Sequence, residues 1–185
     1  MSRHSQILNK KQAALLVVDV QEKINAVMFS GELVKSSVLK LIAGCKVLDV
    51  PIFVTEQYPQ GLGATEPEIV AALVNEKPLE KMNFSCCGAE GFTAGLKQKE
   101  VRQIILTGIE CHVCVLQTAL DLLAHGFQVH LVKDAVSSRK KLDYETAIQR
   151  MAAAGVILTT TETALFELLE TAGTSEFKKV AKLIK

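Results

Sequence analysis

Three side chains that can act as a base, a cation and a nucleophile follow apolar segments of this chain. Asp19 closes the first of these segments, Lys81 closes a shorter one, and Cys114 lies in the turn that leaves another. In an open sheet of parallel strands, ligands bind beyond the carboxyl ends of the strands. If the segments are such strands, we expect the aspartate, the lysine and the cysteine to meet at one edge of the sheet.

Cys114 stands where a protein can activate a thiol. The turn that contains it opens a helix, whose first N–H groups lack partners and whose dipole is positive at that end. Both features stabilise a thiolate, so we expect a lowered pKa for the Cys114 thiol. The same N–H groups can stabilise the oxyanion that forms when a thiolate attacks a carbonyl carbon. The alternative interpretation, a small apolar core residue, stays open.

Asp19 and Lys81 carry weaker signals when each is taken alone. A carboxylate at the end of an apolar strand is partly desolvated and needs a cation or donors, and it then suits a general base. The alternative for Asp19 is a helix N-cap or a loop acid. Lys81 lies between Glu80 and Met82, where most lysines are solvated. Only its position at a strand end makes Lys81 a candidate.

Two kinds of segment alternate along the chain and predict the elements that position these side chains. We expect strands at 13–20, 51–55, 78–81, 101–109, 127–132 and 156–159, and helices at 31–49, 67–74, 89–99, 113–125, 143–154, 163–171 and 176–184. Such alternation is typical of parallel strands joined by right-handed crossovers. The expected fold is α/β, with a doubly wound, Rossmann-like, six-stranded parallel sheet in a three-layer α/β/α arrangement. Residues 1–185 are expected to form a single domain.

Composition excludes several classes of protein. Hydrophobic residues make up 49% of the chain against 22% charged, which excludes disorder, and the formal net charge of +1 suggests neither nucleic acid nor a membrane as partner. No apolar run approaches the roughly 20 residues that cross a bilayer. The polar N-terminal segment lacks the apolar stretch of a signal peptide, so we expect a cytoplasmic protein. The chain has an odd number of cysteines, 5, which indicates free thiols.

The pair Cys111 and Cys114 forms a C-x-x-C, which raises a different interpretation. A thiol redox protein would use these two cysteines, and this alternative stays open. Zinc would need two further ligands, and the histidines form no cluster with the adjacent Cys86 and Cys87. We expect no metal and no cofactor. The basic loop that carries Arg139 is expected to be solvated, or to contact a substrate or another subunit.

Four stretches together resemble the isochorismatase-like hydrolases, and most closely the isochorismatase domain-containing proteins. They are VVDVQEK at 17–23, VTEQYPQGLG at 54–63, EKMNFSC at 80–86 and TGIECHVCVLQTALDLLAHGFQVHLVKDAVSSR at 107–139. The resemblance extends over nearly the whole chain.

The resemblance implies a catalytic triad of Asp19, Lys81 and Cys114. In nicotinamidase-like members the cysteine attacks an amide carbonyl, the aspartate moves protons, and the lysine supplies positive charge. Those members also have a non-proline cis peptide bond before the nucleophile, which here is Ile109–Glu110. The backbone N–H groups of Glu110 and Cys114 then form the oxyanion hole.

Two departures from the family pattern limit the choice of substrate. Metal-binding nicotinamidases carry an aspartate and two histidines after the second strand, whereas the segment here, TEQYPQGLGATE, has no histidine. Isochorismatases that cleave a vinyl ether commonly lack the cysteine, whereas Cys114 is present. The sequence therefore predicts a hydrolase that cleaves a C–N bond of a small amide-type substrate through a Cys114 thioacyl intermediate. Because relatives in this superfamily often form oligomers, the resemblance also implies a homo-oligomer. Residues expected to bind the substrate are Gln21, Phe29, Tyr58, Phe84, Ile109 and Glu110. An alternative function is an oligomeric binding or regulatory protein with little catalysis.

Overall fold

The computed structural model describes residues 3–74 and 76–185, and its centre is one sheet of six parallel strands. The strands lie in the order β3-β2-β1-β4-β5-β6, and each pairs in parallel with its neighbours. Their bounds are β1 Ala13–Val18, β2 Ile52–Gln57, β3 Leu79–Lys81, β4 Gln103–Ile109, β5 Gln128–Ser137 and β6 Ile157–Thr159. The predicted doubly wound sheet is confirmed.

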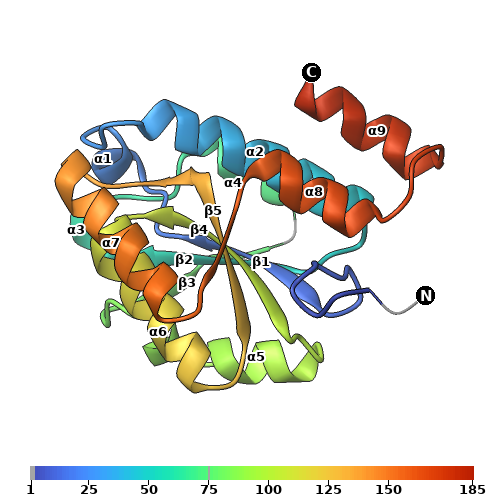
Figure 1. The fold of residues 1–185 in the computed structure, drawn as a ribbon. Coiled ribbons are helices and arrows are strands. Elements are labelled where there is room, and N and C mark those ends of the chain that lie inside the picture. Colours follow the sequence, from blue (N-terminus) through green and yellow to red (C-terminus); the bar gives the residue numbers. More distant parts are fainter. Residues whose placement is uncertain (1–2, 75) are drawn as a thin grey trace.

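Helices cover both faces of this sheet (Figure 1). One layer consists of α2 (Gly31–Val47), α4 (Pro67–Leu73), α8 (Thr161–Leu169) and α9 (Ser175–Ile184). The other consists of α5 (Phe92–Gln98), α6 (Leu116–Ala124) and α7 (Lys141–Ala153). Within the described residues, no helix is long and apolar enough to cross a membrane.

β1 shows how the sequence builds the two cores. All six of its residues, AALLVV, are buried, as expected for a central strand covered on both faces. Leu15 and Val17 pack into the core beneath α2, while Leu16 and Val18 pack into the core on the opposite face. This alternation follows from the two-residue period of a strand. Every residue of β1 must therefore be apolar, because each of the two cores takes every second side chain.

Strand order reverses between β1 and β4, and both strands lead into the candidate site. β1 is followed by β2 and β3 on one side, and β4 is followed by β5 and β6 on the other. At the end of this pair, Gly108 has φ +110°, and a Cβ on it would lie 2.0 Å from the Val18 carbonyl oxygen. Only glycine fits such a close approach of two backbones.

The structure differs from the sequence prediction mostly at the carboxyl edge of the sheet. β5 runs on to Ser137, five residues beyond the predicted end at 132. The prediction stopped early because the polar Lys133 and Asp134 interrupt the apolar pattern of the strand. The predicted helix 113–125 is a π-helix, Cys111–Val115, followed by α6. Short elements also form there: α1 (Glu22–Asn25), α3 (Pro59–Leu62) and a 3₁₀ turn, Cys86–Gly88.

Candidate functional site

Asp19 is the centre of a buried polar cluster at the carboxyl edge. It directly follows β1, its exposed fraction is 0%, and its backbone is left-handed with φ 51°. Thr55, on the neighbouring strand β2, donates its hydroxyl to Asp19 Oδ1 at 2.7 Å. Lys81 Nζ donates to Asp19 Oδ2 at 2.7 Å. Each carboxylate oxygen therefore has a strong donor, which compensates for the loss of water.

Lys81 is a buried cation and not a surface lysine. Its side chain is 0% exposed, and it forms an ion pair with Asp19. Gln57 Oε1 accepts a second hydrogen bond from Lys81 Nζ at 2.7 Å. The backbone carbonyls of Phe84 and Asn83 lie 3.1 Å and 3.3 Å from the same nitrogen. β3 is only three residues long, so its end and the following turn surround the ammonium group.

Cys114 lies in the first turn after β4, inside the π-helix, where the charges of Asp19 and Lys81 both act on its thiol. Burial, and after it the Asp19 charge, raise the pKa of Cys114 to about 12, while the Lys81 charge opposes this shift. The prediction of a lowered Cys114 pKa is therefore wrong for the resting site. Desolvation and the adjacent carboxylate outweigh the helix dipole. The resting nucleophile is therefore a neutral thiol at neutral pH.

Backbone N–H groups lie beside the thiol. The peptide bond Ile109–Glu110 is cis, at the position that the family resemblance implies. Glu110 directly precedes the π-helix, and Cys114 lies in its first turn, where backbone N–H groups can be free to bind an anion. The Glu110 side chain turns to Arg139, whose Nε donates to Oε2 at 3.0 Å.

The exposed residues among those predicted to bind the substrate are aromatic. Phe29, Tyr58 and Phe84 are 46%, 46% and 53% exposed. The Phe84 carbonyl accepts from Lys81 Nζ, and the Tyr58 N–H donates to the Lys81 backbone carbonyl at 3.0 Å, so both rings belong to segments that contact Lys81. Phe29 stacks edge-on against Tyr144, with 5.3 Å between ring centroids.

Gln21 and Ile109 are placed differently from the prediction. Gln21 is fully buried, its Oε1 accepts from the Gln57 N–H, and its Nε2 donates to the carbonyls of Gln57 and Gly63. Its amide is thus occupied in fastening the 58–63 segment, not free for a substrate. The Ile109 side chain is buried in the core beneath α2. The alternation of a strand turns it away from the Cys114 side of the sheet.

Comparison with known proteins identifies the family to which this chain belongs. The isochorismatase domain model matches residues 13–163. The chain belongs to the isochorismatase family. Isochorismatase domain-containing protein 2 of Danio rerio is 41% identical over 178 residues, which cover 96% of this chain and 89% of that protein.

Solved structures of other proteins have the same fold. A structure described as the MAR1 ribonuclease of Caenorhabditis elegans is 41% identical, with TM-score 0.90, over 96% of this chain and 91% of that one. YcaC of Escherichia coli, described as an octameric hydrolase of unknown specificity, is 26% identical, with TM-score 0.91, over 99% of this chain and 91% of that one. These likenesses support a hydrolase of the isochorismatase-like superfamily and name no substrate for this chain.

Three residues of this isochorismatase-family site were missed at the sequence level. Thr55 bonds to Asp19 and Gln57 bonds to Lys81, and the two residues lie two positions apart at the carboxyl end of β2. Cys86 lies 3.6 Å from the Thr55 hydroxyl, and its N–H donates to Thr118 on α6. The strand-end rule that selects Asp19 also applies to β2, but threonine and glutamine are too common at strand ends to stand out.

The two cysteines of the C-x-x-C have different surroundings. Both are free thiols. Burial alone raises the pKa of Cys111 to about 12, whereas the Asp19 charge also contributes to the raised pKa of Cys114. In the described part of the chain, no group of three or more His, Cys, Asp or Glu side chains is arranged to hold a metal ion.

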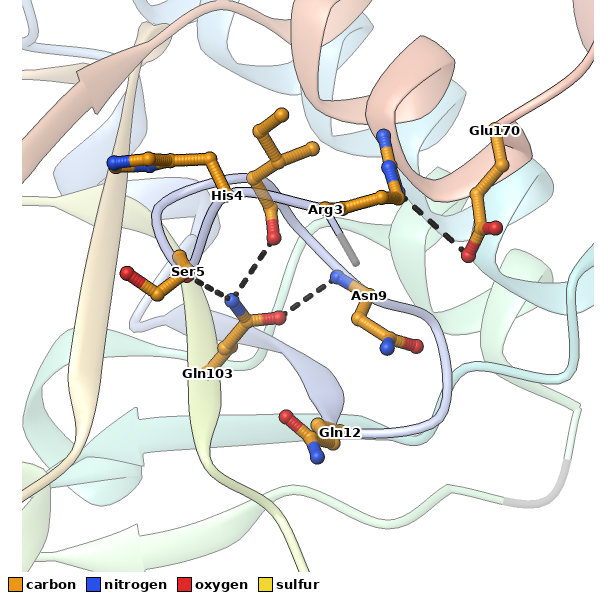
Figure 2. Close-up of a pocket in the computed structure, with 8 residues that line it drawn as sticks. Arg3, His4, Ser5, Asn9, Gln12, Gln103 and Glu170 are labelled. Carbon is orange, nitrogen blue, oxygen red and sulfur yellow. Dashed lines mark hydrogen bonds and ion pairs between the residues drawn. The ribbon is translucent and has the colours of Figure 1, made fainter. Parts of the chain in front are cut away.

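A cavity of about 400 Å³ lies at the opposite, amino edge of the sheet (Figure 2). The segment 3–12, Gln103 and Glu170 line it. Gln103 accepts from the Asn9 N–H at 2.7 Å and donates to the carbonyl of Ser5, while Arg3 pairs with Glu170 at 3.6 Å. These contacts fasten the N-terminal segment to the sheet, and none of them presents a nucleophile.

Proposed function

We propose that this chain is a cysteine hydrolase that cleaves the C–N bond of a small amide-type substrate through a thioacyl intermediate on Cys114. The observation that carries the proposal is the placement of Cys114 where the charges of Asp19 and Lys81 act on its thiol, with Lys81 Nζ 2.7 Å from the Asp19 carboxylate. A nucleophile, a base and a group that orients the base are the requirements of covalent acyl transfer.

The first half of the reaction forms the thioacyl enzyme. Asp19 takes the thiol proton as the Cys114 sulfur attacks the carbonyl carbon, and the Lys81 ammonium holds the accepting carboxylate at 2.7 Å. The N–H groups of Glu110 and Cys114 stabilise the oxyanion. When the C–N bond breaks, Asp19 returns the proton to the leaving nitrogen. An amine or ammonia departs, and the acyl group stays on sulfur.

The second half consumes one water molecule. Asp19 takes a proton from water, whose oxygen attacks the thioester carbon, and the carbon–sulfur bond breaks. The released thiolate recovers the proton from Asp19, and a carboxylic acid leaves. The sum is an amide plus water giving an acid plus an amine. A neutral resting thiol suits this scheme, because the proton needed by the leaving nitrogen is already at the site.

The size of the substrate follows from burial. Asp19 and Lys81 are 0% and 4% exposed, and Cys114 is 6% exposed, so only a small group can reach the sulfur. The exposed rings of Phe29 and Phe84 lie at the same edge and can cover the apolar part of such a molecule. An RNA chain fits this site poorly, because a polynucleotide binds through extended basic surfaces and the net charge is +1.

Trapping of the intermediate tests the proposal. We expect members of a library of small primary and secondary amides, carbamates and imides to add an acyl mass to the Cys114 peptide at low temperature. Release of ammonia or amine should accompany the added mass, and Cys114→Ala should abolish both. If no amide-type compound acylates Cys114, the proposal is wrong, and Cys114-dependent degradation of added RNA would then indicate a ribonuclease instead.

We also propose that the protein is a homo-oligomer. Large apolar side chains are exposed around the carboxyl edge: Val27, Phe29, Met82, Phe84 and Leu142. The octameric state of YcaC gives a precedent on this fold. This surface also favours the alternative function of an oligomeric binding protein, whose ligand would remain intact and would bind equally to Cys114→Ala. The cytoplasmic location remains a prediction.

A further inference from the structure

Gln57 is the last residue of β2 and is 8% exposed. Its backbone is held on both sides by Gln21, which accepts from the Gln57 N–H at 2.8 Å and donates to the Gln57 carbonyl at 3.1 Å. Its side chain is engaged at both ends of the amide as well. Nε2 donates to the Met82 carbonyl at 2.9 Å, and Oε1 faces Lys81 Nζ at 2.7 Å.

The chemistry of the neighbours determines the orientation of this amide. An ammonium group only donates hydrogen bonds and a backbone carbonyl only accepts them. A flipped Gln57 would point N–H at Lys81 and oxygen at Met82, which would cost both bonds. Gln57 is therefore held with its oxygen toward the cation by the turn that follows β3.

Lys81 has all of its hydrogens committed inside the protein. An ammonium group has three N–H bonds. Asp19 and Gln57 each accept at 2.7 Å, and the Phe84 and Asn83 carbonyls lie at 3.1 Å and 3.3 Å. No hydrogen is left over for a substrate. Lys81 therefore acts through its charge on Asp19 and Cys114, and the side chains that hold it determine where that charge lies.

We propose that Gln57 is a positioning residue of the catalytic centre, which holds the Lys81 ammonium against Asp19 while adding no charge of its own. This inference rests on the proposed cysteine hydrolase and deepens it. One cation then faces one carboxylate beside the thiol. A carboxylate at position 57 would place two anions around Lys81 and reduce the positive charge that Asp19 and Cys114 experience. Gln57 thereby helps to determine how readily the thiol loses its proton.

The test is the rate at which iodoacetamide alkylates Cys114 at several pH values, measured by peptide mass spectrometry. The variants are Gln57→Glu, Gln57→Met and, as the matched control, Gln103→Met. Gln103 is also a buried, fully bonded glutamine, but it lies at the amino edge (Figure 2). Circular dichroism and thermal unfolding establish that each variant is folded.

We expect Gln57→Glu to slow alkylation about tenfold at pH 8.5, because an added negative charge within several ångströms raises a thiol pKa by roughly one unit. Gln57→Met removes the acceptor without adding charge, so its rate should fall less. Gln103→Met should alkylate like the wild type. A purely structural role for Gln57 would instead give both Gln57 variants the same change, in proportion to their loss of stability.

A folded Gln57→Glu protein with the wild-type alkylation profile would overturn the proposal. That result would leave the hydrolase proposal standing, because acylation of Cys114 by an amide is measured separately. Conversely, failure of every amide to acylate the wild type would refute the hydrolase, while the alkylation rates would still report whether Gln57 controls the charge at Cys114.

Discussion

The two edges of the sheet use the same residue types for different purposes. Gln57 at the carboxyl edge and Gln103 at the amino edge are both buried, and both have bonded amides. Gln57 holds a cation, whereas Gln103 holds the backbone of the N-terminal segment. Asp19 and Asp49 likewise share a left-handed backbone, with φ 51° and 56°. Asp19 is buried against Lys81, and Asp49 is exposed.

The difference teaches that position in the sheet, and not residue type, decides which groups become reactive. At the carboxyl edge, parallel strands end together, the following helix begins, and strand order reverses between β1 and β4. Helix N-termini there add positive potential. At the amino edge, by contrast, the amide of Gln103 bonds the backbone of the N-terminal segment and serves to close the fold. Substitutions that are matched between the two edges should therefore have unmatched effects.

The largest expected effect comes from Asp19→Asn, with Asp49→Asn as its matched control. We expect hydrolysis to fall by roughly 10²- to 10⁴-fold, because the proton acceptor is lost. Alkylation of Cys114 should become faster than in the wild type at pH 8.5, because the Asp19 charge raises the pKa of the thiol and the variant removes that charge. Asparagine tolerates the left-handed backbone at both positions.

Paired measurements of substrate turnover and of iodoacetamide alkylation check this expectation. Opposite changes in the two rates distinguish loss of the base from general disruption of the site, in which both would fall. If Asp49→Asn reproduced the changes seen in Asp19→Asn, the contrast between the two edges would be refuted.

An intermediate effect is expected for the stability of Gln103→Met. Gln103 Nε2 donates to Gln128 Oε1 at 2.7 Å, and Gln103 Oε1 accepts from the Asn9 N–H. Removal of these bonds leaves the partly buried Asn9 N–H without its acceptor, which costs about 1 kcal/mol. Chemical denaturation measures the free energy of unfolding. Hydrolysis per folded molecule should match the wild type, and a large loss of turnover would mean that the amino edge also controls the chemistry.

The smallest expected effect is a decrease in the stability of the fold at acid pH, caused by His130 near the amino edge. His130 Nε2 lies 3.0 Å from Gln128 Oε1, while Nδ1 is buried with no hydrogen-bond partner among the described residues. Burial lowers the pKa of His130 to about 4. The unfolded chain, with a pKa near 6.5, binds this proton first, so stability is full above pH 6.5 and decreases as the pH falls toward 4.

Thermal unfolding at pH 7, 5.5 and 4.5 checks this dependence in the wild type and in His130→Val. The variant removes the titrating group while Gln128 still receives the Gln103 donor. We expect its unfolding temperature to decrease less between pH 7 and 4.5. An identical slope in both proteins would assign the acid dependence to other groups.

Sequence alone determined the parts of this protein that depend on local pattern. The apolar run before Asp19 had to be buried on both faces, and its alternation with helices predicted the six-stranded sheet that the structure confirms. Direction of the strands then placed Asp19, Lys81 and Cys114 at one edge. These inferences succeed because hydrophobic periodicity and crossover handedness need no knowledge of distant contacts.

Tertiary structure decided the chemistry inside that edge. The sequence predicted an activated Cys114 thiolate from the helix dipole, but the pKa depends on how deeply the sulfur is buried and on which charge lies nearest. The sequence predicted Gln21 as a substrate-binding residue, whereas in the structure its amide bonds to Gln57 and Gly63. Hydrogen-bond partners 36 and 42 residues away leave no local signature in the sequence. Burial and charge pairing act across strands, so only the folded chain reveals them.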